Sequence, residues 1–220
     1  MNPETPTKRL LLFVLALALL LVVVHIGVIS ITFSKLGLTR ESAFLLLFFC
    51  LFGSVVNIPL FTIRSNVPIK DRGVYIPGYL PYLKRLSGRT LIAVNVGGCL
   101  IPLLFSVYLF TTQPLMLYEV LLGVSVVTLV CYLYSFPVKG TGIGMPMLIA
   151  PIFAALIAIM INHELSAPLA YISGTMGVLI GADLLNMRHI SHMGAMVASI
   201  GGAGTFDGIF MTGILAVLLA

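Results

Sequence analysis

Long apolar runs separated by short polar breaks make up most of the chain. A helix needs about 20 consecutive apolar residues to cross a bilayer. We therefore predict about seven transmembrane helices within one domain, residues 1–220, and an all-α fold. Their expected bounds are residues 10–33, 43–63, 91–110, 115–136, 146–161, 168–186 and 193–220.

The last apolar run is interrupted near its middle, where Gly201 to Gly204 includes three glycines. Glycine disfavours helix, and irregular backbone at membrane depth is tolerated only against protein or a water-filled cavity. We therefore expect the seventh helix to be broken there and to restart near Thr205 to Asp207. Such a break leaves bare backbone that an extended chain can approach.

The composition places the chain among integral membrane proteins. Hydrophobic residues make up 60% of the sequence and charged residues 9%, whereas soluble domains carry about 25% charged residues. The three cysteines, Cys50, Cys99 and Cys131, all fall inside apolar runs. We interpret them as small packing residues, not as disulfide partners or metal ligands.

The distribution of basic residues predicts the orientation. With the N-terminus in the cytoplasm, all of the 12 Lys and Arg residues except Lys35 and Arg40 fall on the cytoplasmic side. This bias predicts an N-in, C-out multi-pass protein of the cell membrane. The basic loop 64–90 then faces the cytoplasmic leaflet, so its expected partner is anionic lipid headgroup. Nucleic acid is not an expected partner, because no folded basic module is present to bind it.

Two carboxylates, Asp183 and Asp207, lie inside apolar runs. Acids at membrane depth are costly and mark functional sites. The predicted topology puts both in the cytoplasmic half of adjacent helices, within the paired-Asp region 168–220. Asp207 would lie in the first turn of the restarted helix, where the helix dipole favours negative charge. For Asp183 a second interpretation stays open, in which the carboxylate reaches the headgroups or pairs with Arg188.

Other polar and glycine residues converge on the same half of the membrane. The candidate substrate-binding residues around the two acids are Asn57, Asn95, Asn186, Gly202 and Gly204. The asparagines have a simpler use as well, since amide side chains bridge membrane helices by hydrogen bonds.

A pair of facing carboxylates can share a proton, which is the acid–base arrangement that activates water against a peptide carbonyl. The same pair could instead bind a proton or cation for transport, with Glu119 as the polar group of the outer half. His189 and His192 have a spacing that could join Asp183 on a metal, but headgroup-level histidines are the simpler interpretation. We therefore expect no metal and no cofactor.

Three segments carry a resemblance to known proteins: residues 95–98, 180–186 and 201–208. Over nearly its whole length the chain resembles an uncharacterised family of seven-span prokaryotic membrane proteins of unknown function. More distantly, it is similar to intramembrane aspartyl proteases of the presenilin, signal-peptide-peptidase and prepilin-peptidase group. This resemblance implies a hydrolase that cleaves membrane-embedded or membrane-proximal peptides, with Asp183 and Asp207 as its catalytic pair.

The chain departs from the presenilin-type pattern in several places. Two extra residues precede Asp207 after the Gly-Ala-Gly sequence, no Tyr precedes Asp183, and the Pro-Ala-Leu element is absent. Two alternatives to the protease therefore stay open. One is a proton- or cation-coupled small transporter or channel component that uses the same acidic recess, and the other is a non-catalytic membrane scaffold.

Overall fold

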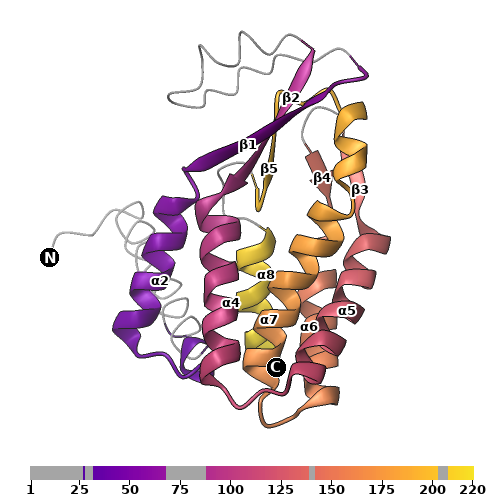
Figure 1. Ribbon diagram of the computed structural model, residues 1–220. Helices are drawn as coiled ribbons and strands as arrows, with labels where there is room; N and C mark the ends of the chain where they lie inside the picture. The colour runs from indigo at the N-terminus through magenta and orange to yellow at the C-terminus, as the bar shows by residue number, and fades with distance from the viewer. Residues whose placement is uncertain (1–26, 28–31, 68–87, 139–141, 203–207) are drawn as a thin grey trace, which may run out of the picture.

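The computed structural model describes residues 27, 32–67, 88–138, 142–202 and 208–220. A bundle of helices carries a small sheet at one end, and the C-terminus lies at the other end (Figure 1). The prediction of a mostly helical chain is confirmed. The prediction of an all-α fold is wrong, because the described residues also form a three-stranded and a two-stranded sheet.

The bundle consists of α-helices extended in two places by π-helical segments and followed by one 3-10 turn. The α-helices are α2 (Arg40–Gly53), α4 (Ile101–Thr112), α5 (Leu117–Tyr134), α6 (Ile149–Ile161), α7 (Ser166–Val178) and α8 (Gly208–Leu219). The π-helical segments are η1 (Val96–Leu100), which leads into α4, and η2 (Leu179–Leu184), which continues α7; the 3-10 turn is η3 (Met187–His192).

Local sequence signals set the helix starts at the end of the bundle away from the sheet. Thr39 caps α2, because its side chain accepts a hydrogen bond from the Ser42 amide. At α5 the bond runs the opposite way: Glu119 lies in the first turn, and its Oε2 accepts from the amide of Met116, the residue before the helix, at 2.9 Å. Such caps satisfy N–H groups that the first turn of a helix leaves unpaired.

Helix α7 is the centre of the bundle, packed against α4, α5, α6 and α8, and most of its residues are buried. Gly177 and the following Gly181 in η2 allow the close approach of α5. A Cβ at Gly177 would lie 2.5 Å from Val127 Cγ1, and a Cβ at Gly181 would overlap the Thr128 carbonyl oxygen. The small-xxx-small pair thus acts as a helix contact, as its spacing predicts.

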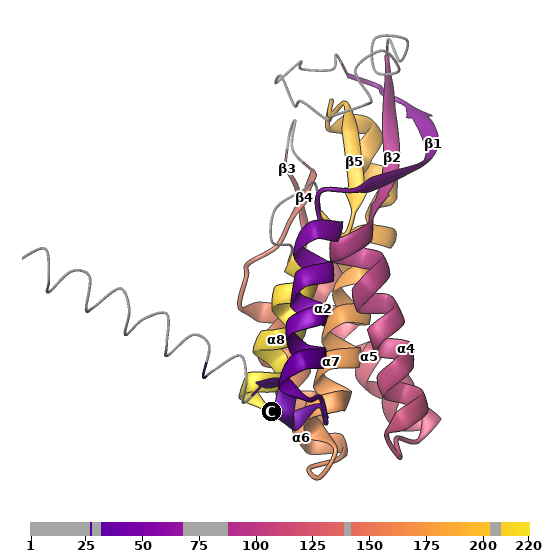
Figure 2. The same ribbon diagram turned by 90° about the vertical axis from the view of Figure 1, so that its left-hand side faces the viewer.

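The larger sheet has the strand order β1-β2-β5, with β1 spanning Asn57–Arg64, β2 Arg89–Asn95 and β5 Val197–Ile200. Strands β1 and β2 are antiparallel, from Asn57↔Asn95 at the bundle to Arg64↔Arg89 at the far end. Strand β5 is parallel to β2. Figure 2 shows the sheet rising from the end of the bundle opposite the C-terminus. A short hairpin, β3 (Phe136–Val138) and β4 (Gly142–Gly144), lies at the same end.

Three of the predicted helices are therefore wrong in part, and the seventh is wrong only before its expected break at Gly201. Residues 43–63, 91–110 and 193–220 each contain a strand, β1, β2 or β5. The physical reason is clearest in β1: Pro59 would break a helix interior but is tolerated on an edge strand, next to the register shift between Pro59 and Phe61.

The remaining predicted helices have mixed outcomes. The helices at 115–136, 146–161 and 168–186 correspond to α5, α6 and α7 with η2. Almost all of the helix at 10–33 lies outside the described residues. Within the described part of the chain, two helices, Leu117–Tyr134 and Ser166–Leu184, are long and apolar enough to cross a membrane, where seven were expected.

Candidate functional site

Three of the residues singled out by sequence, Asn57, Asn95 and Asp183, lie where the sheet joins the bundle. We call this site the polar junction and define it as Asn57, Asn95, Asp183, Ser199 and Gly201. It brings together the beginning of β1, the end of β2, segment η2 and the end of β5 with the residue after it. Residues far apart in the sequence thus lie at the same end of the bundle.

Asn95 is the buried centre of the polar junction, with 1% of its surface exposed. Its Nδ2 donates to the Ser54 carbonyl oxygen at 2.6 Å and to Asn57 Oδ1 at 3.2 Å. Its Oδ1 accepts from the Gly98 amide at 2.7 Å, which caps the start of η1. Both ends of the amide are therefore paired, as a buried polar group requires.

Asn57 extends this network to the third strand. Its Oδ1 accepts from Ser199 Oγ in addition to Asn95 Nδ2. The three strands of the sheet are thus tied together by side chains at the end where they meet the helices. Ser199 was not predicted as a site residue. Its signal in the sequence is a lone hydroxyl in an apolar stretch, two residues before Gly201.

Gly201 follows β5 with a φ of +82° and lies directly against η1. A Cβ at this position would lie 2.5 Å from Cys99 Cβ and 2.7 Å from the Cys99 amide nitrogen. The positive φ and the lack of room for a Cβ both favour glycine at this position. Gly202, the next residue, also has a positive φ, +90°, and its amide donates to the Ser199 carbonyl oxygen at 3.2 Å. Regular structure does end at these two glycines, but a strand and not the expected helix precedes the break, and the expected restart at Thr205 to Asp207 lies outside the described residues.

Asp183 is held against this glycine turn. Its Oδ2 accepts a hydrogen bond from the Gly201 amide at 2.9 Å, and the residue is partly exposed. A hydrogen bond to an ionised carboxylate is stronger than one between neutral groups. This hydrogen bond holds Asp183 at the start of the glycine-rich segment, whereas the predicted pairing of Asp183 with Asp207 lies outside the described residues. Gly204 and Asp207 lie outside the described residues, and α8 begins at Gly208.

Two π-helical segments flank the glycine turn, and the sequence pattern did not predict either. Segment η1 supplies Gly98 and Cys99 against Gly201, and η2 carries Asp183. π-helical turns are rare and occur frequently at functional sites. The signal for these segments in the sequence is their glycines. At Gly97 and Gly181 a Cβ would overlap a neighbouring carbonyl oxygen, so both positions favour glycine.

Asn186 has a different environment from the other two asparagines. Its Nδ2 donates to the Gly181 carbonyl oxygen at 3.0 Å, and the residue is buried. The amide therefore satisfies a carbonyl that η2 leaves unpaired. This hydrogen bond gives Asn186 a role in holding the π-helical turn that carries Asp183.

His192, near the sheet end, has an amide and a hydroxyl as its neighbours, and neither belongs to the usual set of metal ligands. His192 lies 3.1 Å from Asn66 Nδ2 through its Nε2 and 3.1 Å from Ser191 Oγ through its Nδ1. Among the residues that the structure describes, no group of three or more His, Cys, Asp or Glu could hold a metal ion.

Glu119, the acid predicted for the outer half, lies at the opposite end of the bundle and is buried. Its Oε2 caps α5 at the Met116 amide, and its Oε1 accepts from Asn162 Nδ2 at 2.9 Å. Asn162 Oδ1 in turn accepts from the Leu165 amide at 3.1 Å. These hydrogen bonds connect the start of α5 to the turn between α6 and α7, so Glu119 has a structural role there.

Comparison with known proteins identifies the family. No curated protein and no solved structure matches the chain. A family model described as "Protein of unknown function (DUF1614)" matches residues 51–219, which include every residue of the polar junction. The chain therefore belongs to the DUF1614 family, whose function is unknown.

Proposed function

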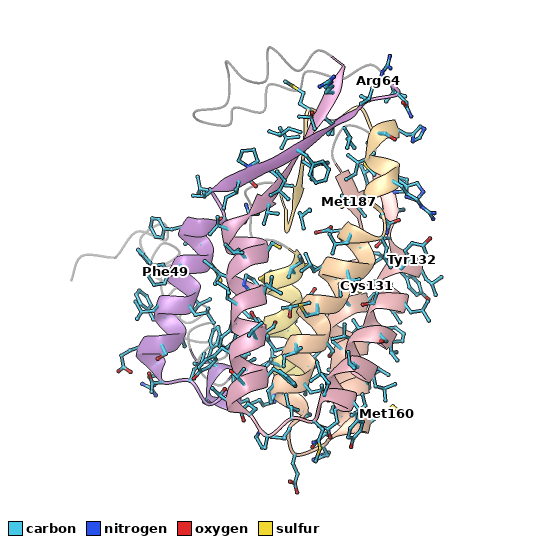
Figure 3. The ribbon with its side chains drawn as sticks, in the orientation of Figure 1. Phe49, Arg64, Cys131, Tyr132, Met160 and Met187 are labelled. Carbon is cyan, nitrogen blue, oxygen red and sulfur yellow. The ribbon has the colours of Figure 1, made fainter. Side chains whose placement is uncertain are left out.

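We propose that the helical bundle is embedded in a lipid bilayer as a multi-pass protein of the cell membrane. Large apolar side chains cover its outside, including Phe44 on α2 (67% exposed), Leu133 on α5 (67%) and Met160 on α6 (81%). Figure 3 shows Phe49 and Met160 pointing outward on opposite sides. Soluble proteins rarely expose contiguous apolar patches of more than a few hundred Å², whereas lipid tails accept such a surface.

The interior of the bundle supports the same proposal, because its residues are small and partly polar. Ala154 and Ala158 on α6 are fully buried, and Ser173 and Thr175 on α7 are buried as well. Thr175 Oγ1 lies 2.9 Å from Ser106 Oγ on α4. Small residues and hydroxyl pairs between helices are typical of membrane bundles, where helices gain little from hiding apolar surface.

Helix length and charge position the bundle in the bilayer. Helix α5 has 18 residues, and at 1.5 Å per residue it is ~27 Å long, close to the ~30 Å of the hydrocarbon core. The sheet end carries Arg64, Arg89 and Arg188 among the described residues, and the basic segment 64–90 begins and ends at this sheet in the sequence. The positive-inside rule therefore puts this end, and the polar junction with it, on the cytoplasmic side.

We infer that the polar junction belongs to an intramembrane aspartyl endopeptidase, with Asp183 and Asp207 as the catalytic pair. One observation supports this proposal most strongly: Asp183 Oδ2 is bound to the Gly201 amide. This hydrogen bond fixes the first acid on a segment that reaches the second acid after six more residues. Asp207 enters the proposal from the sequence, through its place just before α8.

The proposed chemistry needs only the two carboxyl groups and water. One carboxylate takes a proton from a water molecule as the water oxygen bonds to the peptide carbonyl carbon. The other carboxyl group gives its proton to the carbonyl oxygen. The C–N bond then breaks, and the proton taken from water passes to the leaving nitrogen. The carbonyl hydroxyl returns its proton to the carboxylate that donated it, which leaves a carboxylic acid and restores the pair. Asn57 and Asn95 are positioning residues in this scheme, since the hydrogen bond between their amides ties β1 to β2 at the polar junction.

Proton or cation transport is the alternative use of the same acids. A permeant would need a polar exit in the outer half, and the acid predicted there, Glu119, is occupied by the Met116 amide and by Asn162. No observation on the described residues favours transport, so we propose the endopeptidase in preference.

Cleavage of a membrane peptide by the reconstituted chain tests the proposed function. We expect Asp183→Asn and Asp207→Asn each to lower the cleavage rate by at least ~10³-fold, because each removes one half of the acid–base pair. The matched control is Glu164→Gln, an exposed acid at the opposite end of the bundle, which should cleave at the wild-type rate. A variant of either aspartate that stays folded and cleaves normally would contradict the proposal.

A further inference from the structure

Two arginines face each other at the far end of the larger sheet. Arg64, the last residue of β1, is the register partner of Arg89, the first residue of β2. Both are exposed, and Figure 3 shows Arg64 at the end of the sheet away from the bundle. Directly opposed residues of an antiparallel pair have Cβ atoms about 4.5–5.5 Å apart, and like charges there are destabilising. The fold therefore holds two positive charges at one point.

The described part of the chain supplies no counter-charge to this pair. Neither guanidinium is in an ion pair or a hydrogen bond there. Arg188, at the same end of the molecule, differs because its Nη2 donates to Tyr132 Oη at 2.8 Å. Guanidinium groups bind phosphate in a bidentate manner, so two of them side by side fit one phosphate group.

The apolar surface of β1 sets the level of the arginines relative to the bilayer. Ile58, Leu60 and Phe61 are exposed large apolar side chains, and Arg64 follows three residues after Phe61. At ~3.3 Å per residue, Arg64 lies ~10 Å beyond Phe61. The polar zone on each side of the hydrocarbon core is ~5–8 Å thick. With Phe61 at the edge of the core, the Arg64 backbone lies at the outer edge of this zone, and its long side chain reaches back to the headgroup phosphates.

We propose that Arg64 and Arg89 together bind the phosphate of an anionic phospholipid headgroup in the cytoplasmic leaflet. This inference rests on the membrane embedding of the proposed function and is independent of the peptidase chemistry. The bound lipid neutralises the charge repulsion between the two strands. It also fixes the height of the sheet, because β1 and β2 both run between the arginines at one end and Asn57 and Asn95 of the polar junction at the other.

Reconstitution of the full-length chain into lipid nanodiscs tests this inference. The discs contain phosphatidylcholine alone or with added phosphatidylglycerol, and the readout is the midpoint of thermal unfolding. Phosphatidylglycerol should raise the midpoint of the wild type and of Arg40→Gln, a matched control with an exposed arginine at the opposite end. The double variant Arg64→Gln/Arg89→Gln should lose this rise. In phosphatidylcholine alone its midpoint should equal or exceed that of the wild type, because the repulsion is gone.

The contradicting outcomes can be told apart. A double variant that keeps the full phosphatidylglycerol effect would overturn the lipid site and leave the embedding intact. An equal rise with inorganic phosphate in neutral discs would assign the pair to a soluble anion and would also overturn it. A wild-type chain that stays monodisperse in buffer without lipid or detergent would overturn the embedding and this inference together.

Discussion

Gly201 is the residue at which the geometry of the polar junction is most constrained. It combines a φ of +82° with direct contact against Cys99, and its amide holds the Asp183 carboxylate. A side chain here would push the turn away from η1 and would move the donor that positions the acid. The glycine thus connects a local backbone requirement to the placement of a catalytic group in the proposed function.

Alanine at this position should cost stability for two separable reasons. Gly201→Ala and Gly88→Ala should each lose about 1–2 kcal/mol of unfolding free energy from the positive φ, which is +76° at Gly88. A Cβ at Gly88 meets nothing within 4 Å, so only Gly201→Ala should lose a further 1–3 kcal/mol or so from overpacking. Denaturant unfolding in micelles measures the difference. Equal losses in the two variants would show that the contact with Cys99 is not restrictive.

The exposed face of helix α5 is the clearest support, within a single element, for the proposal that the bundle lies in lipid. Its Leu121, Leu129 and Leu133 are all more than half exposed, while Gly123, Val127 and Cys131 are buried. The exposed face is thus at least as apolar as the buried face. Water would not stabilise such a helix, but a bilayer would.

Cysteine accessibility tests this assignment of α5. With the three native cysteines replaced by alanine, Leu129→Cys in the middle of α5 should react far more slowly with a membrane-impermeant maleimide than Thr111→Cys near the bundle end. Both positions are exposed on the protein surface, so they differ in surroundings rather than in burial. Lipid suppresses the thiolate and excludes the reagent. Equal labelling rates in intact membranes would contradict the embedding.

Single elements also show which parts of the fold the sequence could predict. Helices α5, α6 and α7 follow from long apolar runs with clear ends, and the glycine break follows from Gly201 and Gly202. Strands β1, β2 and β5 could not be predicted, because each is a short apolar segment next to an apolar helix, and periodicity cannot separate the two there. Pro59 and the β-branched residues of β1, such as Ile58 and Thr62, were the signals available.

Within the candidate site, the sequence predicted residue types better than residue roles. Asn57, Asn95 and Asp183 do converge, but Asn95 has all its hydrogen-bonding groups paired within the protein. Asn186 holds a turn of its own helix. These roles depend on the sheet and on the π-helical turns, neither of which the apolar pattern contains. Polar residues at membrane depth can serve the framework as well as a substrate.

The whole molecule has two unlike ends around an apolar middle. One end carries the sheet, the polar junction and Arg64 with Arg89, and the other carries the capping acid Glu119 and the C-terminus (Figure 1). The proposed activity places all its chemistry at the sheet end. Its central claim is that Asp183 and Asp207 face each other across the glycine turn.

Cross-linking in native membranes tests that claim most directly. In a chain whose native cysteines are replaced by alanine, Asp183→Cys/Asp207→Cys should form a disulfide or link through a short bifunctional reagent. A disulfide needs Cα atoms within about 7 Å. The positive control is Ile58→Cys/Val94→Cys, two register partners in β1 and β2. The negative control pairs Asp183→Cys with Glu164→Cys at the opposite end. Linking of the aspartate pair is the predicted result, and its absence while Ile58→Cys/Val94→Cys links would contradict the account.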